Sequence, residues 1–215
     1  MVSTLCSGLG SYAWRMRIDP ASLDGKERHK LLNGVIVPRP IGWISTVDAD
    51  GVSNLAPFSW FQVVSSTPPV VMFSSGARNG GLKDTAANAL ATGNFVVNIV
   101  SADLLEAMNA TSIEAPAEVD EFAYANLEAA PSERVAAPRV ASAPVALECE
   151  TMHHFEIPSG GNTVIFGQVV LAHVRDDLRD ENGYIDMSGL NPVARLAGND
   201  YALLGELVTV ARPGD

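Results

Sequence analysis

The feature that most constrains the fold is a run of alternating residues that begins near position 41. One face of a predicted β-strand would carry Ile41, Trp43, Ser45 and Val47, and the other face Gly42, Ile44 and Thr46. Turn residues follow over 48–51, where Gly51 can adopt the positive φ that a hairpin turn needs. A second strand is predicted over 52–61. Pro57 cannot donate to a sheet, so it indicates an edge or a bulge. The pattern predicts a β-hairpin.

The rest of the chain contains more predicted strand than helix. Strands are predicted over 70–74, 94–100, 145–157 and 163–175, with further candidates at 184–185 and 201–210. Helices are predicted over 22–32, 82–92 and 101–109, with Ser22 and Ser101 as N-caps and Asn33-Gly34 and Gly93 as stop signals. The buried stripe of the second helix would comprise Leu82, Ala86, Ala89 and Leu90. Hairpin connections with few helices predict a mainly β fold, a closed or nearly closed β-barrel with peripheral helices.

Two segments lack a clear periodic pattern. Residues 111–144 are rich in Ala, Pro and Glu, and we interpret them as a surface excursion anchored by Phe122, Tyr124 and Leu127. A disordered linker is the alternative. Residues 1–18 do not read as a signal peptide, because the charges of Arg15 and Arg17 follow the apolar part. We therefore expect an N-terminal extension over 1–18 and one domain over 19–210.

Composition excludes several functional classes. The 215 residues carry a net charge of −11 and a pI near 4.7, which argues against nucleic acid as a partner. The sequence has no apolar run of the roughly 20 residues needed to span a membrane. Cys6 and Cys149 have no metal or redox spacing, and two free thiols in a reducing cytoplasm are favoured over one disulfide. His153 and His154 would face opposite sides of a strand, so no metal site is predicted.

A glycine-rich loop over 76–81 is the strongest candidate for ligand binding. No Asp or Glu occurs between Gly51 and Lys83, and the loop carries Arg78 just before a predicted helix. It is not a P-loop, because Asp84 stands where Ser or Thr is required. A cation in the first helical turn opposes the helix dipole, and a bound phosphate would resolve this conflict, with Thr85 or backbone N–H groups as further donors. The alternative is an ordinary exposed loop with Lys83 in water.

Four small polar residues of the hairpin point to the shape of the ligand. Ser45, Thr46, Asn54 and Ser59 lie in an apolar segment, and each needs a partner if it is buried. Backbone groups near strand ends could satisfy any one of them. All four beside a phosphate loop favour a planar heterocycle with hydrogen-bonding groups. The nearby aromatic residues are expected in the core more often than against a ligand; they are Trp43, Phe58, Trp60 and Phe61.

These segments resemble the flavin reductase-like, FMN-binding split-barrel family. The resemblance is carried by PRPIGWISTVDADGVSNLAPFSWFQVVSSTPPVVMFS (38–74), SGARNGGLKDT, TGNFVVNIVS, VDEF, SAPVALECE, FGQVV and NPVARLAGNDYALLGE, and extends over roughly 19–206. It implies a split β-barrel homodimer that binds one FMN per subunit near the dimer interface, with NAD(P)H as co-substrate. It places the isoalloxazine ring against Trp43, Ser45, Thr46, Asn54, Leu55, Ala56, Pro57 and Ser59. It places the ribityl phosphate among Ser74, Arg78, Lys83, Asp84 and Thr85, with Arg195 and Tyr201 reaching the partner's cofactor.

The sequence departs from the family at one position. Many of these reductases carry a histidine in a Gly-Asp-His run, whereas this chain reads SGGNTVIFGQVV, with Asn162 near that place. The resemblance therefore implies an FMN-dependent oxidoreductase that passes hydride from NAD(P)H to flavin and on to free flavin or a small acceptor. We assign no catalytic residue. Asn162 motivates the alternative of a flavin-binding protein with little turnover, an electron carrier or cofactor store. A split barrel that binds another ligand, such as haem, is a third reading.

Overall fold

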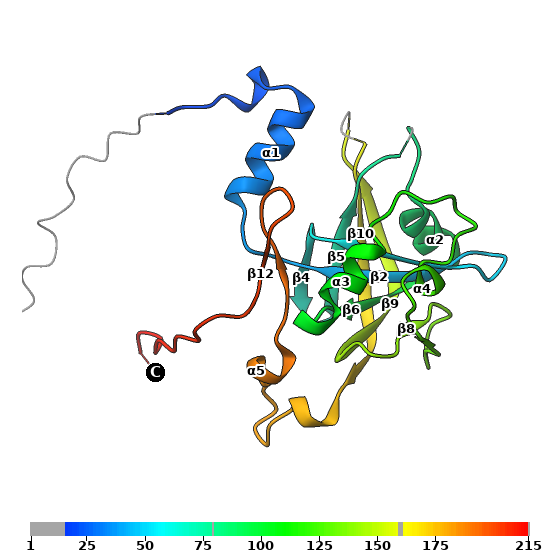
Figure 1. Cartoon of the computed structure of the whole chain (residues 1–215), viewed down its shortest axis with the longest axis vertical. Helices are drawn as coiled ribbons and strands as arrows, with labels where there is room; N and C mark the ends of the chain where they lie inside the picture. Colours follow the sequence, from blue (N-terminus) through cyan, green and yellow to red (C-terminus); the bar gives the residue numbers. More distant parts are fainter. Residues whose placement is uncertain (1–15, 79, 159–160, 215) are drawn as a thin grey trace, which may run out of the picture.

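The fold is a seven-stranded antiparallel sheet that curls into a nearly closed barrel (Figure 1). A computed structural model describes residues 16–78, 80–158 and 161–214. In spatial order the strands are β3 (Ser53–Phe58), β2 (Gly42–Val47), β6 (Asn94–Ile99), β9 (Val145–Glu156), β10 (Thr163–Val174), β5 (Pro69–Ser75) and β4 (Phe61–Ser66). The two edge strands, β3 and β4, are consecutive in the chain with only Ser59 and Trp60 between them, so the edges of the sheet meet there. The predicted mainly β barrel is confirmed.

The first hairpin forms as its alternation predicts. In β2 and β3, Trp43 pairs with Pro57 and Val47 with Ser53, and Gly51 in the turn has φ +88°. Pro57 lies on an edge strand, as expected. The predicted second strand is too long, because β3 ends at Phe58 and Phe61 begins β4, where it pairs with Phe73 of β5. The sequence analysis missed β4, whose residues do not alternate and whose Val63 is 64% exposed.

The first helix begins later and ends later than predicted. Helix α1 (Gly25–Val35) has Asp24 as its N-cap, in a reciprocal capping box with Glu27. Ser22 instead closes the short turn η1 (Pro20–Ser22). Asn33 and Gly34 do not stop the helix, and the Asn33 side chain donates back to the His29 carbonyl. Side-chain capping at Asp24 therefore sets the start of α1.

The second helix, α2 (Asp84–Thr92), begins two residues later than predicted. Lys83 is its N-cap residue rather than part of its first turn, and Leu82 is 43% exposed outside the helix. Ala86 and Ala89 are fully buried against the sheet, and Gly93 ends the helix with φ +74°. The predicted third helix is divided into η2 (Ala102–Leu104) and α3 (Leu105–Ala110), and the Ser101 side chain makes no capping bond.

The 111–144 segment is ordered rather than a linker. It contains α4 (Glu121–Tyr124), β7 (Ala129–Ala130) and β8 (Arg139–Val140). Phe122 is buried and Leu127 partly buried in the core, whereas Tyr124 is 57% exposed and does not anchor the segment. Glu148 of β9 is fully buried and accepts hydrogen bonds from three backbone N–H groups of 133–135, at 2.6–3.2 Å. This carboxylate holds the segment against the barrel.

A second, three-stranded sheet closes the chain. It joins β1 (Arg39–Pro40), β11 (Ala194–Arg195) and β12 (Tyr201–Ala202), and it follows η3 (Asp176–Leu178) and α5 (Met187–Leu190). The candidate at 184–185 forms only a single bridge between Ile185 and Arg179. The strand predicted over 201–210 ends at Ala202, because no strand of the same protomer lies beside the residues that follow, and Val208 and Val210 are 77% and 81% exposed. Figure 1 shows this last segment leading away from the barrel.

Two predictions about the whole chain have different outcomes. Among the described residues, no helix is long and apolar enough to cross a membrane. Cys149 is fully buried in the barrel core, but Cys6 lies outside the described residues, so the choice between free thiols and a disulfide stays a prediction. The same holds for the extension over 1–18.

Candidate functional site

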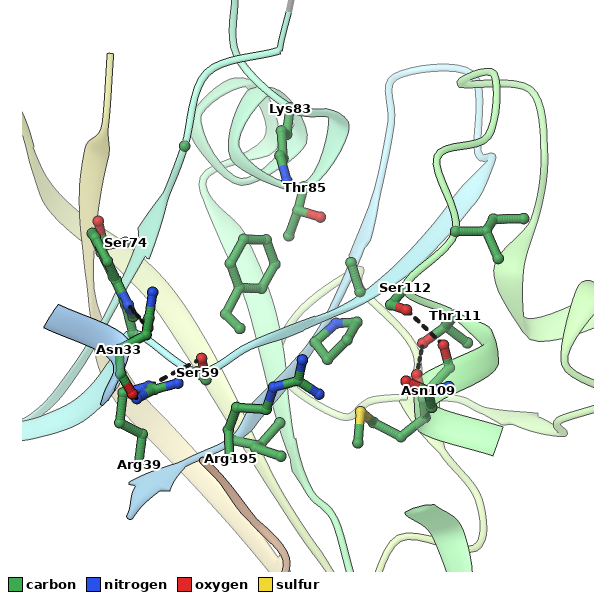
Figure 2. Close-up of a pocket in the computed structure, with 18 of the residues that line it drawn as sticks. Asn33, Arg39, Ser59, Ser74, Lys83, Thr85, Asn109, Thr111, Ser112 and Arg195 are labelled. Carbon is green, nitrogen blue, oxygen red and sulfur yellow. Dashed lines mark hydrogen bonds between the residues drawn. The ribbon is translucent and has the colours of Figure 1, made fainter. Parts of the chain in front are cut away.

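A cavity of about 940 Å³ lies where the barrel meets α1, α3 and the three-stranded sheet. Its walls come from the β3–β4 junction, the 76–85 loop with the start of α2, the 108–115 segment after α3, and the 195–201 turn between β11 and β12 (Figure 2). This volume falls within the range of about 300–1,000 Å³ that is usual for small-molecule sites. The cavity is the candidate site.

The charge of the cavity is opposite to that of the chain. Its lining includes five Lys or Arg residues (Lys30, Arg39, Arg78, Lys83 and Arg195) and three acidic residues (Asp84, Glu114 and Glu121). The lining therefore carries a formal charge of 5 − 3 = +2, whereas the whole chain carries −11. Cations gathered in a cleft attract and concentrate anions, so the cavity favours an anionic ligand.

The start of α2 presents unused hydrogen-bond donors beside this cavity. The N-cap residue Lys83 makes no side-chain capping bond, and the first helical bond runs from the Ala87 N–H to the Lys83 carbonyl. The N–H groups before Ala87 therefore have no acceptor within the helix. Figure 2 shows Lys83 and Thr85 together at this end of the cavity. Within the part of the chain that the structure describes, no carboxylate forms an ion pair with Lys83. This end is suited to a phosphate.

Arg78 is held differently. Its guanidinium lies 3.3 Å from the Asp84 carboxylate and donates to the Ala115 carbonyl at 2.9 Å. The loop also closes on itself through two backbone bonds between Arg78 and Gly81. Arg78 therefore links the loop, the start of α2 and the 108–115 wall. Its positive charge is shared with Asp84, which leaves Lys83 as the stronger candidate for binding an anion.

A buried polar network fixes the floor next to the α2 end. Thr85 Oγ1 donates to Asn54 Oδ1 at 2.6 Å, and Asn54 Nδ2 donates to Glu121 Oε2 at 3.0 Å. The same Glu121 oxygen accepts the backbone N–H of Leu55. Burial raises the pKa of Glu121, an effect that the hydrogen bonds from Leu55 and Asn54 oppose. Both ends of the Asn54 amide are therefore engaged, and this orients Thr85 toward the cavity.

Asn162 lies in the cavity wall opposite the loop. Its amide donates to Ser74 Oγ at 3.0 Å, across the β10–β5 junction. Ser74 keeps its hydroxyl hydrogen for another acceptor, because a hydroxyl can donate one bond and accept others. The position where many family members carry histidine therefore supplies an amide that supports Ser74 in this chain.

Nine of the thirteen predicted site residues line the cavity. They are Asn54, Ala56, Pro57, Ser59, Ser74, Arg78, Lys83, Asp84 and Thr85. Trp43, Ser45, Thr46 and Leu55 do not line it, and all four are fully buried. The Trp43 indole N–H donates to Thr111 Oγ1, and Ser45 Oγ donates to the Pro138 carbonyl. Strand alternation turns these two side chains toward the excursion over 111–144 rather than toward the cavity.

Several lining residues were not predicted as cofactor ligands. They include Asn33, Arg39, Trp60, Asn109, Thr111, Ser112, Glu121 and Asn162. Trp60 was considered mainly as a core residue, but it is 37% exposed and its indole N–H donates to Asn33 Oδ1 at 3.0 Å. Arg195 and Tyr201, which the resemblance directed toward a partner's cofactor, line the cavity of their own protomer. Arg39 lies in the PRPIG run that carries the resemblance, and this was the available signal.

Comparison with known proteins gives a consistent answer. The family model described as "Flavin reductase like domain" matches residues 34–192. The protein BH2278 of Halalkalibacterium halodurans, described as uncharacterized, is 41% identical over 205 residues, 92% of this chain and 97% of the relative.

Solved structures agree with this match. Nitrilotriacetate monooxygenase component B from Bacillus cereus has a TM-score of 0.87 at 35% identity, covering 91% of this chain and 98% of the other. The 2-nitrobenzoate 2-nitroreductase NbaA from Pseudomonas fluorescens has a TM-score of 0.85 at 26% identity, covering 93% and 97%. The barrel is therefore the split barrel of these proteins. The chain belongs to the flavin reductase-like family.

Proposed function

We propose that this protein is an FMN-dependent oxidoreductase that takes hydride from NAD(P)H and passes electrons to free flavin or a small organic acceptor. The observation that carries the proposal is the uncapped start of α2, where Lys83 and free N–H groups lie beside the cavity. This arrangement suits the terminal phosphate that FMN carries and riboflavin lacks. Membership of a flavin-binding family supplies the prior expectation.

The lining residues fit both parts of FMN. Lys83, Arg78 and the hydroxyls of Ser74 and Thr85 offer donors for the phosphate at one end. Ala56, Pro57 and Ser59 on the β3–β4 side offer a mixed apolar and polar surface for a planar ring. Bound flavin would supply the redox chemistry, accepting two electrons as hydride and giving them to an acceptor. The protein's own part is to bind, orient and shield the ring.

Two structures in the comparison support an oxidoreductase. One is a component of a monooxygenase and the other a nitroreductase, so this barrel serves redox proteins whose described activities differ. Their descriptions do not name a substrate for this chain. A small acceptor, NAD(P)H as donor and a cytoplasmic location therefore form part of the proposal.

We also propose that the protein is a homodimer with its domain over 19–210. Apolar side chains are exposed on two segments that leave the barrel. At the end of α1, Val35 and Ile36 are 65% and 58% exposed, and near the C-terminus Val208 and Val210 are 77% and 81% exposed. Apolar surface of this extent is typical of an interface, and a second copy would cover it.

Asn162 favours one alternative function. A flavin-binding protein that exchanges electrons slowly, as a carrier or cofactor store, would not need the histidine that many family reductases carry at this place. In this chain Asn162 is engaged with Ser74. The carrier would retain FMN but would be reduced slowly by both NADH and NADPH.

The test is the visible absorption spectrum of the purified protein before and after anaerobic addition of NADH or NADPH. Under the main proposal the protein shows a flavin spectrum that bleaches rapidly with one of the two. A persistent flavin spectrum would favour the carrier. Refusal of added FMN by a folded protein would overturn both.

A further inference from the structure

The end of the cavity opposite Lys83 contains two arginines on neighbouring strands. Arg39 of β1 is directly opposite Arg195 of β11, and Arg195 is in turn opposite Tyr201 of β12. All three side chains line the cavity. Figure 2 shows Arg39 and Arg195 together at one end, with Lys83 and Thr85 at the other. Like charges directly opposite one another destabilise an antiparallel pair, so this arrangement needs a cause.

Neither arginine has a counter-ion in the part of the chain that the structure describes. The ion pairs found there involve Arg78, His173 and Arg175. Arg39 is only 7% exposed, and its guanidinium donates to the carbonyls of Asn33, Ile36 and Leu196 at 2.7–2.9 Å, which are neutral acceptors. Burial, followed by the nearby charge of Arg195, lowers the pKa of Arg39. A buried charge that is bonded only to neutral groups retains an unmet attraction for an anion.

Arg195 is positioned but keeps free donors. Its guanidinium carbon lies 4.4 Å from the centre of the Tyr201 ring, and one terminal nitrogen donates to the Gly198 carbonyl. The Tyr201 hydroxyl donates to Asn109 Oδ1 at 2.9 Å, which holds the ring in place. A guanidinium has five N–H donors, so Arg195 has several left for a ligand. Its stacking on Tyr201 fixes the plane in which they lie.

We propose that Arg39 and Arg195 form a second anion-binding subsite, which binds a carboxylate or phosphate group of the second ligand of the cavity. Arg195 makes the direct contact, and Arg39 contributes positive charge and holds β1 against β11. The inference rests on the proposed function, because the first ligand is taken to be FMN with its phosphate at the α2 end. The anionic group can belong to the electron donor or to the acceptor, and the two sources share the same chemistry.

The experiment is calorimetric titration of FMN-loaded protein with two matched pairs of probes. Oxidised nicotinamide mononucleotide and nicotinamide riboside differ by one phosphate, and benzoate and benzamide differ by a carboxylate. We expect at least one anionic probe to bind more tightly than its matched partner. Arg195→Gln should weaken that probe by about tenfold or more, the usual effect of losing a charge-assisted bond, and should leave its partner unchanged. Arg195→Lys should recover part of the loss.

Arg212→Gln is the matched control, because it removes the same charge from an exposed residue that does not line the cavity. A loss confined to the phosphate pair would place the donor at this end, and a loss confined to the carboxylate pair would place the acceptor there. Equal binding of every probe by wild type and Arg195→Gln would overturn the proposal.

Cofactor binding separates this result from failure of the proposed function. If Arg195→Gln abolishes the preference for FMN over riboflavin, this end binds the cofactor's own phosphate and the second subsite does not exist. If wild-type protein binds no FMN, the proposed function fails, and the same titrations on that protein still decide whether Arg195 binds an anion.

Discussion

Replacing Lys83 by Ala should weaken FMN far more than riboflavin. Lys83 is the N-cap residue of α2, contributes no capping bond and has no carboxylate partner within the described part of the chain. Its removal should therefore leave the helix intact and delete one charge-assisted bond to phosphate. Such bonds are worth about 1.5–3 kcal/mol, which corresponds to a loss of about 10- to 150-fold in FMN affinity. Riboflavin, which has no phosphate, should lose less than about twofold on the same reasoning.

Arg78→Ala should have a different effect from Lys83→Ala. Arg78 shares its charge with Asp84 at 3.3 Å, and both side chains are 34% exposed, so solvent screens this pair. Removing Arg78 deletes one donor and also leaves Asp84 as an uncompensated negative charge beside the phosphate. Asp84→Asn in the Arg78→Ala background should therefore restore part of the FMN affinity. Without this rescue, the assignment of Arg78 to the phosphate end would be wrong.

The assay is fluorescence titration of cofactor-free protein with FMN and with riboflavin. Lys26→Ala is the matched control, because Lys26 is exposed on α1 and does not line the cavity. Thermal unfolding of each variant verifies that the barrel is intact. Equal losses for FMN and riboflavin in Lys83→Ala would refute the placement of the phosphate at the start of α2.

Three further predictions concern the barrel itself. Gly167→Ala should cost about 1–3 kcal/mol in urea unfolding, because the added Cβ would lie 2.3 Å from Cζ of buried Phe95; Gly34→Ala, in open space on α1, should be neutral or stabilising. Glu148 has a pKa below its ordinary value, since hydrogen bonds from the Glu133 N–H and from His173 outweigh the opposing effect of burial. Its contribution is thus present above the unfolded-state pKa and is lost as pH falls through the folded-state pKa; Glu148→Gln should lower neutral stability by about 1.5–3 kcal/mol and flatten the acid limb of the stability curve. Burial raises the pKa of the Cys149 thiol, so peptide mapping should find it unmodified by a thiol reagent at pH 8 until the protein unfolds.

Local sequence patterns predicted the parts of the fold that local forces determine. The period-2 alternation and the Gly51 turn gave β2 and β3, and long apolar runs gave β6, β9 and β10. They failed where pairing with a distant partner decides the outcome. Strand β4 forms because Phe61 meets Phe73, and the strand predicted over 201–210 ends at Ala202 because no neighbouring strand extends it.

The candidate site divides in the same way. The phosphate loop could be found in the sequence, because Arg78, Lys83 and Thr85 lie within eight residues of one another and precede a helix. Arg39 could not be placed, because its guanidinium reaches Leu196, 157 positions away, through the pairing of β1 with β11. Trp43 and Ser45 were assigned to the ring through the family resemblance, but the packing of the 111–144 segment covers them.

The two cationic ends of the cavity contribute to function at some cost to the fold. Arg39 and Arg195 are like charges on paired strands, and Lys83 stands at the positive end of a helix dipole. Each arrangement is less stable without an anion than with one, and an alternative residue at each position would remove the conflict. Because a chain with net charge −11 has carboxylates elsewhere to offset these cations, their isolation in one cavity is a property of the site rather than of overall composition. Two separated anionic groups, one at each end, would satisfy both conflicts together. A flavin phosphate alone accounts for one end, so the cavity is built for two ligands.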